Sequence, residues 1–234
     1  MIVLGVETST ARSSVAVLDA DRGGPDGVVL ASAANDDPRG HGAFLAPAIA
    51  ACCAEAGLGV VDLDGVAVGT GPGLYTGLRI GLATAAALAW ARGIPVAGVG
   101  GLDAVVRAAR RRPELAGVPL VAVLDARRGQ WFHATALPGD GPVRPAVGDA
   151  AAVAAAVAAA GPDAVAVGER PDGGPGGGPD GGALRPDAAD VARLAVPALR
   201  AGGTGPAELA PVYLREADVR IGWAARGGGR VVGA

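Results

Sequence analysis

The sequence predicts an α/β fold made of two related halves, and three observations support this prediction. Short apolar runs typical of strands are interspersed with longer segments in which apolar residues follow helical spacing. In both halves an apolar run ends at a carboxylate, is followed by a polar turn, and resumes; this happens at Glu7 and again at Asp125. The chain of 234 residues is long enough to bury a sizeable core without disulfides.

The first half opens with three predicted strands. Apolar residues fill 2–6, residues 14–18 alternate, and 28–33 form a third run. The polar turn 8–13 separates the first two strands, while glycine and proline mark a turn over 19–26. The chain therefore begins with a strand, an acidic residue, a polar turn and a second strand.

Helices and further strands complete this half. Helical spacing predicts a helix over 43–57, with Pro47 expected in its first turn and Gly57 as its C-terminal cap. The remaining elements are a strand over 65–68, a helix over 75–92, a strand over 95–99 and a helix over 102–112. The first hundred residues thus have the order βββαβα.

The second half repeats the pattern in a degenerate form. Its predicted elements are strands over 120–124, 131–137 and 164–167 and helices over 150–160 and 186–200, with a short extended or helical piece over 211–216. The Gly- and Pro-rich segment 170–182 is expected to be a flexible surface loop, and 226–234 a disordered tail. We therefore expect an N-terminal lobe over 1–104 and a C-terminal lobe over 105–225.

The helix over 75–92 has an unusual composition. Gly77 and Gly81 lie four residues apart inside it, and each glycine costs about 1 kcal/mol relative to alanine in a helix interior. A close contact should offset this cost. Because the helix is apolar on nearly all sides, it is either enclosed within its own fold or covers its sheet with one side and offers the other to a partner.

Composition excludes several kinds of chemistry. All 20 basic residues are arginine, so a lysine in a phosphate loop, Schiff base or general-base role is excluded. The net charge of −3 disfavours a stand-alone nucleic-acid binder. Cys52 and Cys53 are adjacent, lack metal-ligand spacing, and are expected to be buried small residues. No secretory signal is recognised, and the apolar stretch 80–91 is too short to span a bilayer, so we expect a soluble cytoplasmic protein.

Candidate catalytic groups are sparse. Glu7 and Asp125 occupy equivalent strand ends, where this type of fold can hold a metal and a nucleotide, but the turns that follow them lack the required glycines. We interpret both acids as turn formers. His41 and His133 are not paired at metal-binding spacing and are interpreted as structural. The glycine loop 69–73 is interpreted as a tight turn that starts a helix.

The two halves suggest the duplicated fold of actin, sugar kinases and Hsp70, and the motifs narrow this to one family. The chain resembles the TsaB (YeaZ) family over most of its length. The motifs that carry the resemblance are V-L-G-V-E-T-S-T-A-R-S-S-V-A-V from Val3, R-G-H-G from Arg39, G-P-G-L-Y-T-G-L-R-I-G from Gly71, L-D-A-R-R-G from Leu124 and P-V-Y-L-R from Pro211. Glu7 stands where aspartate is usual, and Gly42 and Ala43 replace the usual serine and glutamate.

The resemblance implies a non-catalytic subunit, without a cofactor or metal of its own, that pairs with the catalytic subunit TsaD to modify the adenosine next to the tRNA anticodon. It also implies the ATPase TsaE in a larger complex, and contact with tRNA only through that complex. In the absence of the partner, we expect the chain to form a homodimer. The alternative is a divergent ATP-dependent carbamoyltransferase or metallopeptidase of the same superfamily.

The family pairs through the two helices of its N-terminal lobe. The resemblance therefore implies a partner interface on both helices, with Gly81→Leu expected to prevent pairing without unfolding the chain. Arg79 either extends to solvent or pairs with a carboxylate across this interface, and we favour the second. The implied interface residues are His41, Phe44, Leu45, Ala48, Tyr75, Thr76, Gly77, Leu78, Arg79, Gly81, Leu82 and Ala85.

Overall fold

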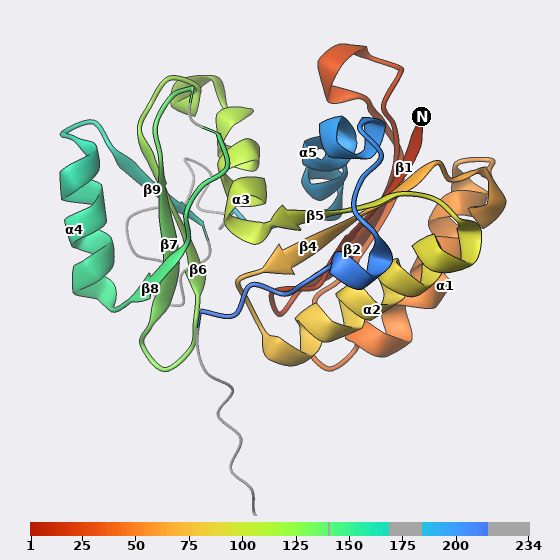
Figure 1. The fold of residues 1–234 in the computed structure, drawn as a ribbon. Helices are drawn as coiled ribbons and strands as arrows, with labels where there is room; N and C mark the ends of the chain where they lie inside the picture. The colour runs from red at the N-terminus through yellow and green to blue at the C-terminus, as the bar shows by residue number, and fades with distance from the viewer. Residues whose placement is uncertain (140, 169–183, 215–234) are drawn as a thin grey trace, which may run out of the picture.

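The computed structural model describes residues 1–139, 141–168 and 184–214, which form two mixed β-sheets with helices packed on them (Figure 1). The first sheet has the strand order β3-β2-β1-β4-β5 and the second β8-β7-β6-β9. In both sheets the leading strand pairs antiparallel with its successor and parallel with the strand that follows a helix. This repeated topology confirms the duplicated α/β fold with a shorter second half.

The bounds of the elements agree closely with the predicted ranges. The strands are β1 (Ile2–Glu7), β2 (Ser13–Asp19), β3 (Val28–Asn35), β4 (Gly65–Gly71), β5 (Val96–Gly100), β6 (Leu120–Asp125), β7 (Trp131–Ala136), β8 (Ala146–Gly148) and β9 (Val165–Gly168). The α-helices are α1 (His41–Glu55), α2 (Tyr75–Arg92), α3 (Gly101–Arg110), α4 (Ala150–Ala160) and α5 (Ala188–Arg200).

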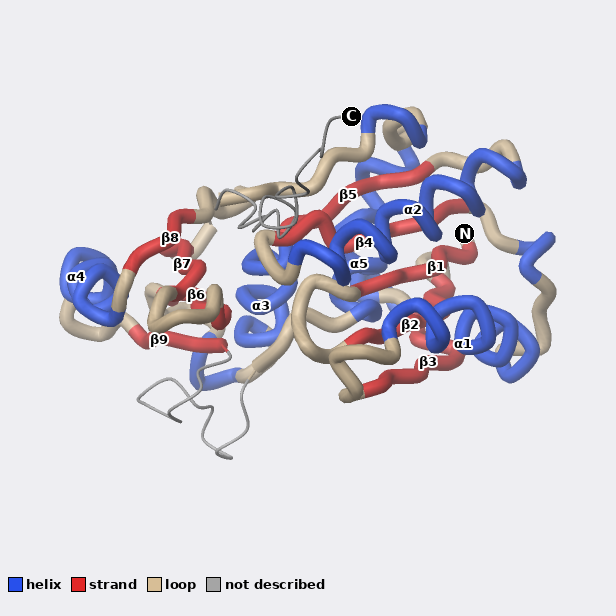
Figure 2. Tube along the Cα trace, turned by 90° about the horizontal axis from the view of Figure 1, so that it is seen from below, coloured by secondary structure: helices blue, strands red, loops and turns tan. Residues whose placement is uncertain are grey.

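The first sheet is buried on both faces, as Figures 1 and 2 show. Leu4 and Val6 point to one face, where they pack with α1 and α2, and Val3 points to the other, where it packs with α5. Alternation along a strand produces this division. At Gly5 a Cβ atom would lie within 3.0 Å of the Ala188 carbonyl, so glycine is required for α5 to approach β1 this closely.

The position of α5 differs from the expected division of the chain. We placed residues 105–225 in a C-terminal lobe, yet α5 returns to cover the first sheet, and the amide of Ala188 donates to Ser14 Oγ at 3.0 Å. Helical periodicity predicts that this segment has an apolar face but not which sheet that face covers. The boundary at residue 104 stays a prediction.

The second sheet lies between α3 and α4. One face, including Leu120 and Phe132, packs with α3 residues such as Leu102. The opposite face, including Val121, packs with Val153 of α4. Figure 1 shows α3 on the side of this sheet that faces the first half, and α4 on its outer side.

Smaller differences concern single elements. Helix α1 begins at His41, so Pro47 lies in its second turn and not in its first, and the Ala43 carbonyl loses its usual amide partner on the exposed side. The three-residue strand β8 was not predicted. The predicted loop over 170–182 and the tail over 226–234 lie outside the described residues. The 211–214 segment is not helical, and the Val212 amide donates to the Thr70 carbonyl at 2.8 Å.

Candidate partner-docking surface

The glycines of α2 face the interior of this chain. A Cβ atom at Gly77 would lie within 3.0 Å of the Thr8 carbonyl oxygen, and one at Gly81 equally close to Thr8 Oγ1. The Thr8 hydroxyl donates to the Gly77 carbonyl at 2.8 Å. The close contact predicted from the two glycines therefore exists, but the neighbouring segment is the β1–β2 turn of the same molecule. Of the two alternatives left open by the sequence, the contact that offsets the cost of these glycines is the internal one.

The opposite sides of α1 and α2 form a nearly uncharged surface, which we call the docking face. The structure describes every residue of the two helices, and only Glu55 and Arg79 among their exposed residues carry charge. The docking face comprises Gly42, Ala43, Ala46, Pro47, Ala50, Ala51 and Ala54 of α1 and Tyr75, Thr76, Arg79, Ala83, Ala87, Trp90 and Ala91 of α2. Trp90 is 80% exposed, so a large indole is left in solvent.

The N-terminal end of α2 carries an exposed aromatic cluster. The rings of Tyr75 and Tyr213 stack with centroids 5.2 Å apart, and the guanidinium carbon of Arg79 lies 4.0 Å from the Tyr75 ring centroid. Arg79 Nε donates to the Tyr213 hydroxyl at 3.2 Å. Arg79 is thus held by two tyrosines of its own chain, and the carboxylate partner favoured from the sequence stays a prediction. The cluster also fixes the 211–214 segment beside α2.

The structure divides the twelve interface residues implied by the resemblance into three groups. Three of them are exposed, namely Tyr75, Thr76 and Arg79. Phe44 is half-buried. The buried ones are His41, Leu45, Ala48, Gly77, Leu78, Gly81, Leu82 and Ala85. The buried residues hold the helices on the sheet, so any contact with a partner would fall to their exposed neighbours.

Sequence reasoning missed most of the docking face. It identified both helices but selected the stripe that faces the core, including Leu45 and Leu82. A signal was present, because Ala43, Ala46, Pro47 and Ala50 recur at spacings of three and four residues on the other side of α1. Because alanine lies on both sides of α1, the sequence alone does not show which stripe of the helix is buried. Tyr213 is distant in sequence, so no local pattern connects it with Tyr75.

Glu7, the first candidate catalytic acid, is completely buried at the end of β1. One carboxylate oxygen accepts the Ser9 amide, and the other lies where a Cβ atom at Gly69 would be. Burial raises the pKa of Glu7, with a smaller contribution from the Asp187 carboxylate, while hydrogen bonds from Ser9 oppose the rise. This carboxylate has no exposed surface through which to contact a substrate.

Asp125, the second candidate, closes the equivalent turn of the second half. Its Oδ1 accepts the Arg127 amide at 2.7 Å, the same two-residue relationship that Glu7 has with Ser9. Arg127 and Arg128 both adopt left-handed conformations, with φ of 64° and 57°. The interpretation of both acids as turn formers is therefore confirmed by their hydrogen bonds.

The two histidines and the two cysteines were the remaining candidate site residues, and their surroundings are those of structural residues. His41 Nε2 lies 2.9 Å from the Thr10 carbonyl and the side chain is buried, while burial lowers the pKa of His133. Cys52 and Cys53 are buried free thiols, as expected. Within the described ranges, no group of three or more His, Cys, Asp or Glu side chains could hold a metal ion. No helix in these ranges has the length and apolar character needed to cross a membrane.

Comparisons with known proteins identify the family. Residues 27–173 match the family model of TsaD, tRNA N6-adenosine threonylcarbamoyltransferase. An uncharacterized protein of Mycobacterium bovis is 37% identical over 218 residues, or 93% of each chain. The tRNA threonylcarbamoyladenosine biosynthesis protein TsaB of Bacillus subtilis is 30% identical over 132 residues, which cover 56% of this chain and 53% of that protein.

A solved structure shares the fold over nearly its full length. The structure of YeaZ from Pseudomonas aeruginosa superposes with a TM-score of 0.69 at 26% sequence identity, covering 91% of this chain and 99% of YeaZ. The family model spans more than half of the chain. This chain belongs to the TsaB/YeaZ branch of the TsaD family.

Proposed function

We propose that this chain is a non-catalytic subunit that pairs with the catalytic subunit TsaD, through the docking face, for threonylcarbamoyl modification of the adenosine next to the tRNA anticodon. Membership of the TsaB/YeaZ branch supports a role in the biosynthesis of this modified nucleoside. As implied by the family, TsaE joins the larger complex, tRNA is contacted through that complex, and the protein acts in the cytoplasm.

The observation that carries the proposal is the uncharged exposed side of α1 and α2. A helix on the surface of a soluble domain usually has a charged or polar outer side. Here two neighbouring helices expose alanine, Pro47 and Trp90 with Glu55 and Arg79 as the only exposed charges in these two helices. Large apolar surfaces of this kind mark sites of protein association. The small side chains would let a partner helix approach closely.

The sealed acid at the end of β1 supports a non-catalytic role. Glu7 is packed against Gly69 and the Ser9 amide, so it cannot coordinate a metal-bound nucleotide without rearrangement of β4. At the equivalent position Asp125 is engaged by Arg127, through the amide and through an ion pair of 3.2 Å. We infer that neither acid has retained a role in phosphate chemistry.

The proposal is tested by co-expressing the chain with TsaD and TsaE and assaying the modified nucleoside in tRNA. Ala50→Glu on α1 and Ala83→Glu on α2 each place a charge on the docking face without touching the core. Both should reduce co-purification with TsaD and the yield of modified tRNA. Ala155→Glu, at an exposed position on α4, is the matched control and should behave as wild type. Equal co-purification of all four proteins would contradict the proposed surface.

Nucleotide titration distinguishes the proposed non-catalytic role from the alternative that the chain is an enzyme. If the isolated chain is non-catalytic, ATP with Mg²⁺ should give no stoichiometric binding heat, and Glu7→Gln should leave modification by the assembled complex unchanged. Tight stoichiometric ATP binding that is lost in Glu7→Gln would favour a divergent ATP-dependent transferase.

A further inference from the structure

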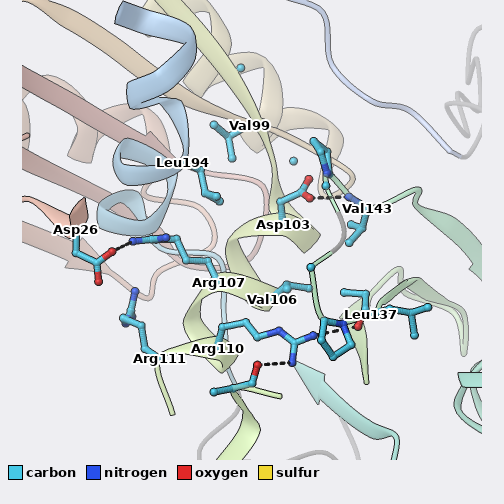
Figure 3. Close-up of a pocket in the computed structure, with 18 residues that line it drawn as sticks. Asp26, Val99, Asp103, Val106, Arg107, Arg110, Arg111, Leu137, Val143 and Leu194 are labelled. Atoms are coloured by element: carbon cyan, nitrogen blue, oxygen red, sulfur yellow. Dashed lines mark hydrogen bonds and ion pairs between the residues drawn. The ribbon is translucent and has the colours of Figure 1, made fainter. Parts of the chain in front are cut away.

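A hollow of about 760 Å³ lies between the two halves, beside α3 and α5 (Figure 3). Because α5 covers the face of the first sheet opposite α1 and α2, the hollow lies away from the docking face. We call it the interlobe pocket. Its floor is α3, one wall is the end of β5 with Leu194 of α5, and the other wall is the segment that follows β7. The volume lies within the range of small-molecule sites, which is about 300–1,000 Å³.

Arginine side chains gather at one end of the pocket. Arg107 lines it from α3 and Arg111 from the residue that follows α3, while Arg193 of α5 pairs with the same carboxylate, Asp190. All three guanidinium groups approach the same oxygen, Oδ1 of the buried Asp190, with Arg107 Nε at 3.6 Å and Arg193 Nη1 at 3.5 Å. Arg107 also pairs with Asp26 at 2.5 Å. In the described ion pairs, three arginines therefore share two carboxylates.

This arrangement leaves hydrogen-bonding capacity for an anion. Arg107 Nε is buried and makes no hydrogen bond. Burial and the proximity of the other arginines lower the pKa of Arg111 and of Arg193, so the charges at this end repel one another. The Arg111 side chain is 44% exposed and reaches the opening of the pocket. An incoming anion would meet donors already held in place by Asp190.

The rest of the pocket is lined mainly by apolar residues, together with Asp103 and with Arg110, whose guanidinium group donates to the Leu115 and Ala136 carbonyls. Val106 of α3, Leu194 and Val143 face the cavity, and Figure 3 shows Asp103 at the end away from Asp26. Asp103 Oδ1 accepts the Val143 amide at 2.8 Å, which joins α3 to the opposite wall. Burial raises the pKa of Asp103. Apolar walls with a few convergent polar groups are characteristic of ligand sites.

We propose that the interlobe pocket binds a small molecule with an apolar ring or chain and one anionic group, a phosphate or a carboxylate, which Arg107 and Arg111 hold at the Asp26 end. Paired guanidinium groups match both anions with charge-assisted hydrogen bonds. The pocket is bordered by α5, which covers the face of the first sheet opposite α1 and α2. A ligand and a docked partner can therefore be bound at the same time.

Four probes separate the contributions of the ring and the anion. Phenyl phosphate and phenylacetate carry both, benzyl alcohol has only the ring, and inorganic phosphate has only the charge. Calorimetric titration of the full chain should give dissociation constants at least about tenfold lower for one or both of the ring-bearing anions than for either single-feature probe. Preference between the two anions assigns the group as phosphate or carboxylate.

Three variants locate the binding. Arg111→Ala should weaken the anionic probes about tenfold, because one charge-assisted contact is lost while Asp190 keeps two arginines. Val106→Phe fills the cavity without changing charge and should abolish binding of the ring-bearing probes even if Arg111→Ala fails to fold. Arg39→Ala, an exposed arginine of the first half, should have no effect. Unchanged binding in Val106→Phe, or no saturable binding of either anionic probe, would overturn the proposal.

Discussion

At the scale of single residues, glycine at positions 77 and 81 is required by contacts within the chain. The Thr8 carbonyl and hydroxyl occupy the space that a side chain at these positions would need. These contacts argue against the expectation that Gly81→Leu leaves the fold intact, because the larger side chain would have to displace Thr8 of the β1–β2 turn. The glycines position α2 on the sheet, and the outer side of α2 is what remains available to a partner.

We predict that Gly77→Ala lowers the free energy of unfolding by about 1–3 kcal/mol, as overpacking does at rigid backbone contacts. In an unobstructed helix the same change would stabilise by about 1 kcal/mol, so the sign of the effect is informative. Urea denaturation measures it. Gly117→Ala is the control, because a Cβ atom there meets open space and the residue has no positive φ. A stabilised Gly77→Ala protein would show that Thr8 does not constrain this position.

Glu7 is a second residue whose environment has a measurable consequence. Its folded-state pKa is raised above the ordinary value of 4.5, mainly because burial disfavours the charged form. A carboxyl group of this kind contributes most to stability below pH 4.5, where it is neutral in both states. That contribution is lost as pH rises toward the folded-state pKa, because the unfolded chain releases the proton more readily.

We therefore predict that Glu7→Gln is more stable than wild type at neutral pH and that the difference shrinks toward pH 4.5. The amide keeps the acceptor for the Ser9 amide, and its NH₂ group can donate to the buried Ser9 hydroxyl oxygen. Urea denaturation from pH 4 to 8 tests this. If the two proteins lose stability in parallel over that range, Glu7 does not titrate as described.

At the scale of elements, the sequence predicted helices and strands well where the pattern is long. Both ends of α2 were correct, because Pro72 and Gly73 precede it and Gly93 ends it. The strand β8 was missed since three residues cannot show a period. The position of α5 could not be predicted, because it depends on Gly5 and Ser14 in distant strands.

The docking face could be predicted from the sequence only in part, also because it depends on packing. The sequence showed that α2 is apolar on most sides, but apolar content alone does not distinguish the side that covers the sheet from the side in solvent. Only the packed structure shows that Leu45 and Leu82 face inward while Ala46 and Ala83 face outward. The interlobe pocket was not predicted either, because Arg111 and Asp190 are far apart in sequence and converge only when α5 returns to the first sheet.

Asp190 connects α5 with α3, which leads to a prediction about α5. This carboxylate is 1% exposed and pairs with arginines of α3 and of α5 itself. Asp190→Asn removes its charge and leaves those arginines without their shared partner, which should cost about 3 kcal/mol of unfolding free energy. Asp36→Asn removes an exposed carboxylate that pairs with Arg12 and should cost less than about 1 kcal/mol. Denaturant unfolding compares the two, and equal costs would contradict the role assigned to Asp190.

At the scale of the whole molecule, the exposed apolar side of α1 and α2 should also govern self-association. In the absence of a partner, two copies can cover their docking faces against each other, and we predict a homodimer that dissociates on dilution. Sedimentation velocity over a range of concentrations measures it. Ala46→Glu should shift the equilibrium to monomer, and Ala155→Glu should not. A wild-type chain that is monomeric at every concentration would contradict this prediction.

The two sides of the first sheet thus have different roles in this account. The side covered by α5 faces the interlobe pocket, and the side covered by α1 and α2 presents a surface suited to a protein. Because Glu7 is completely buried in its turn, we infer that the first sheet serves as a rigid support for the docking face. Pairing with TsaD through that face is the central claim.

Calorimetric titration of TsaD into the double variant Ala46→Glu/Ala83→Glu tests this claim most directly. Two buried, unpaired charges at the interface should weaken the wild-type affinity by at least about a hundredfold, while the melting temperature of the variant stays unchanged. Ala155→Glu should bind TsaD as wild type does. A double variant that binds TsaD with wild-type affinity would show that pairing uses another surface.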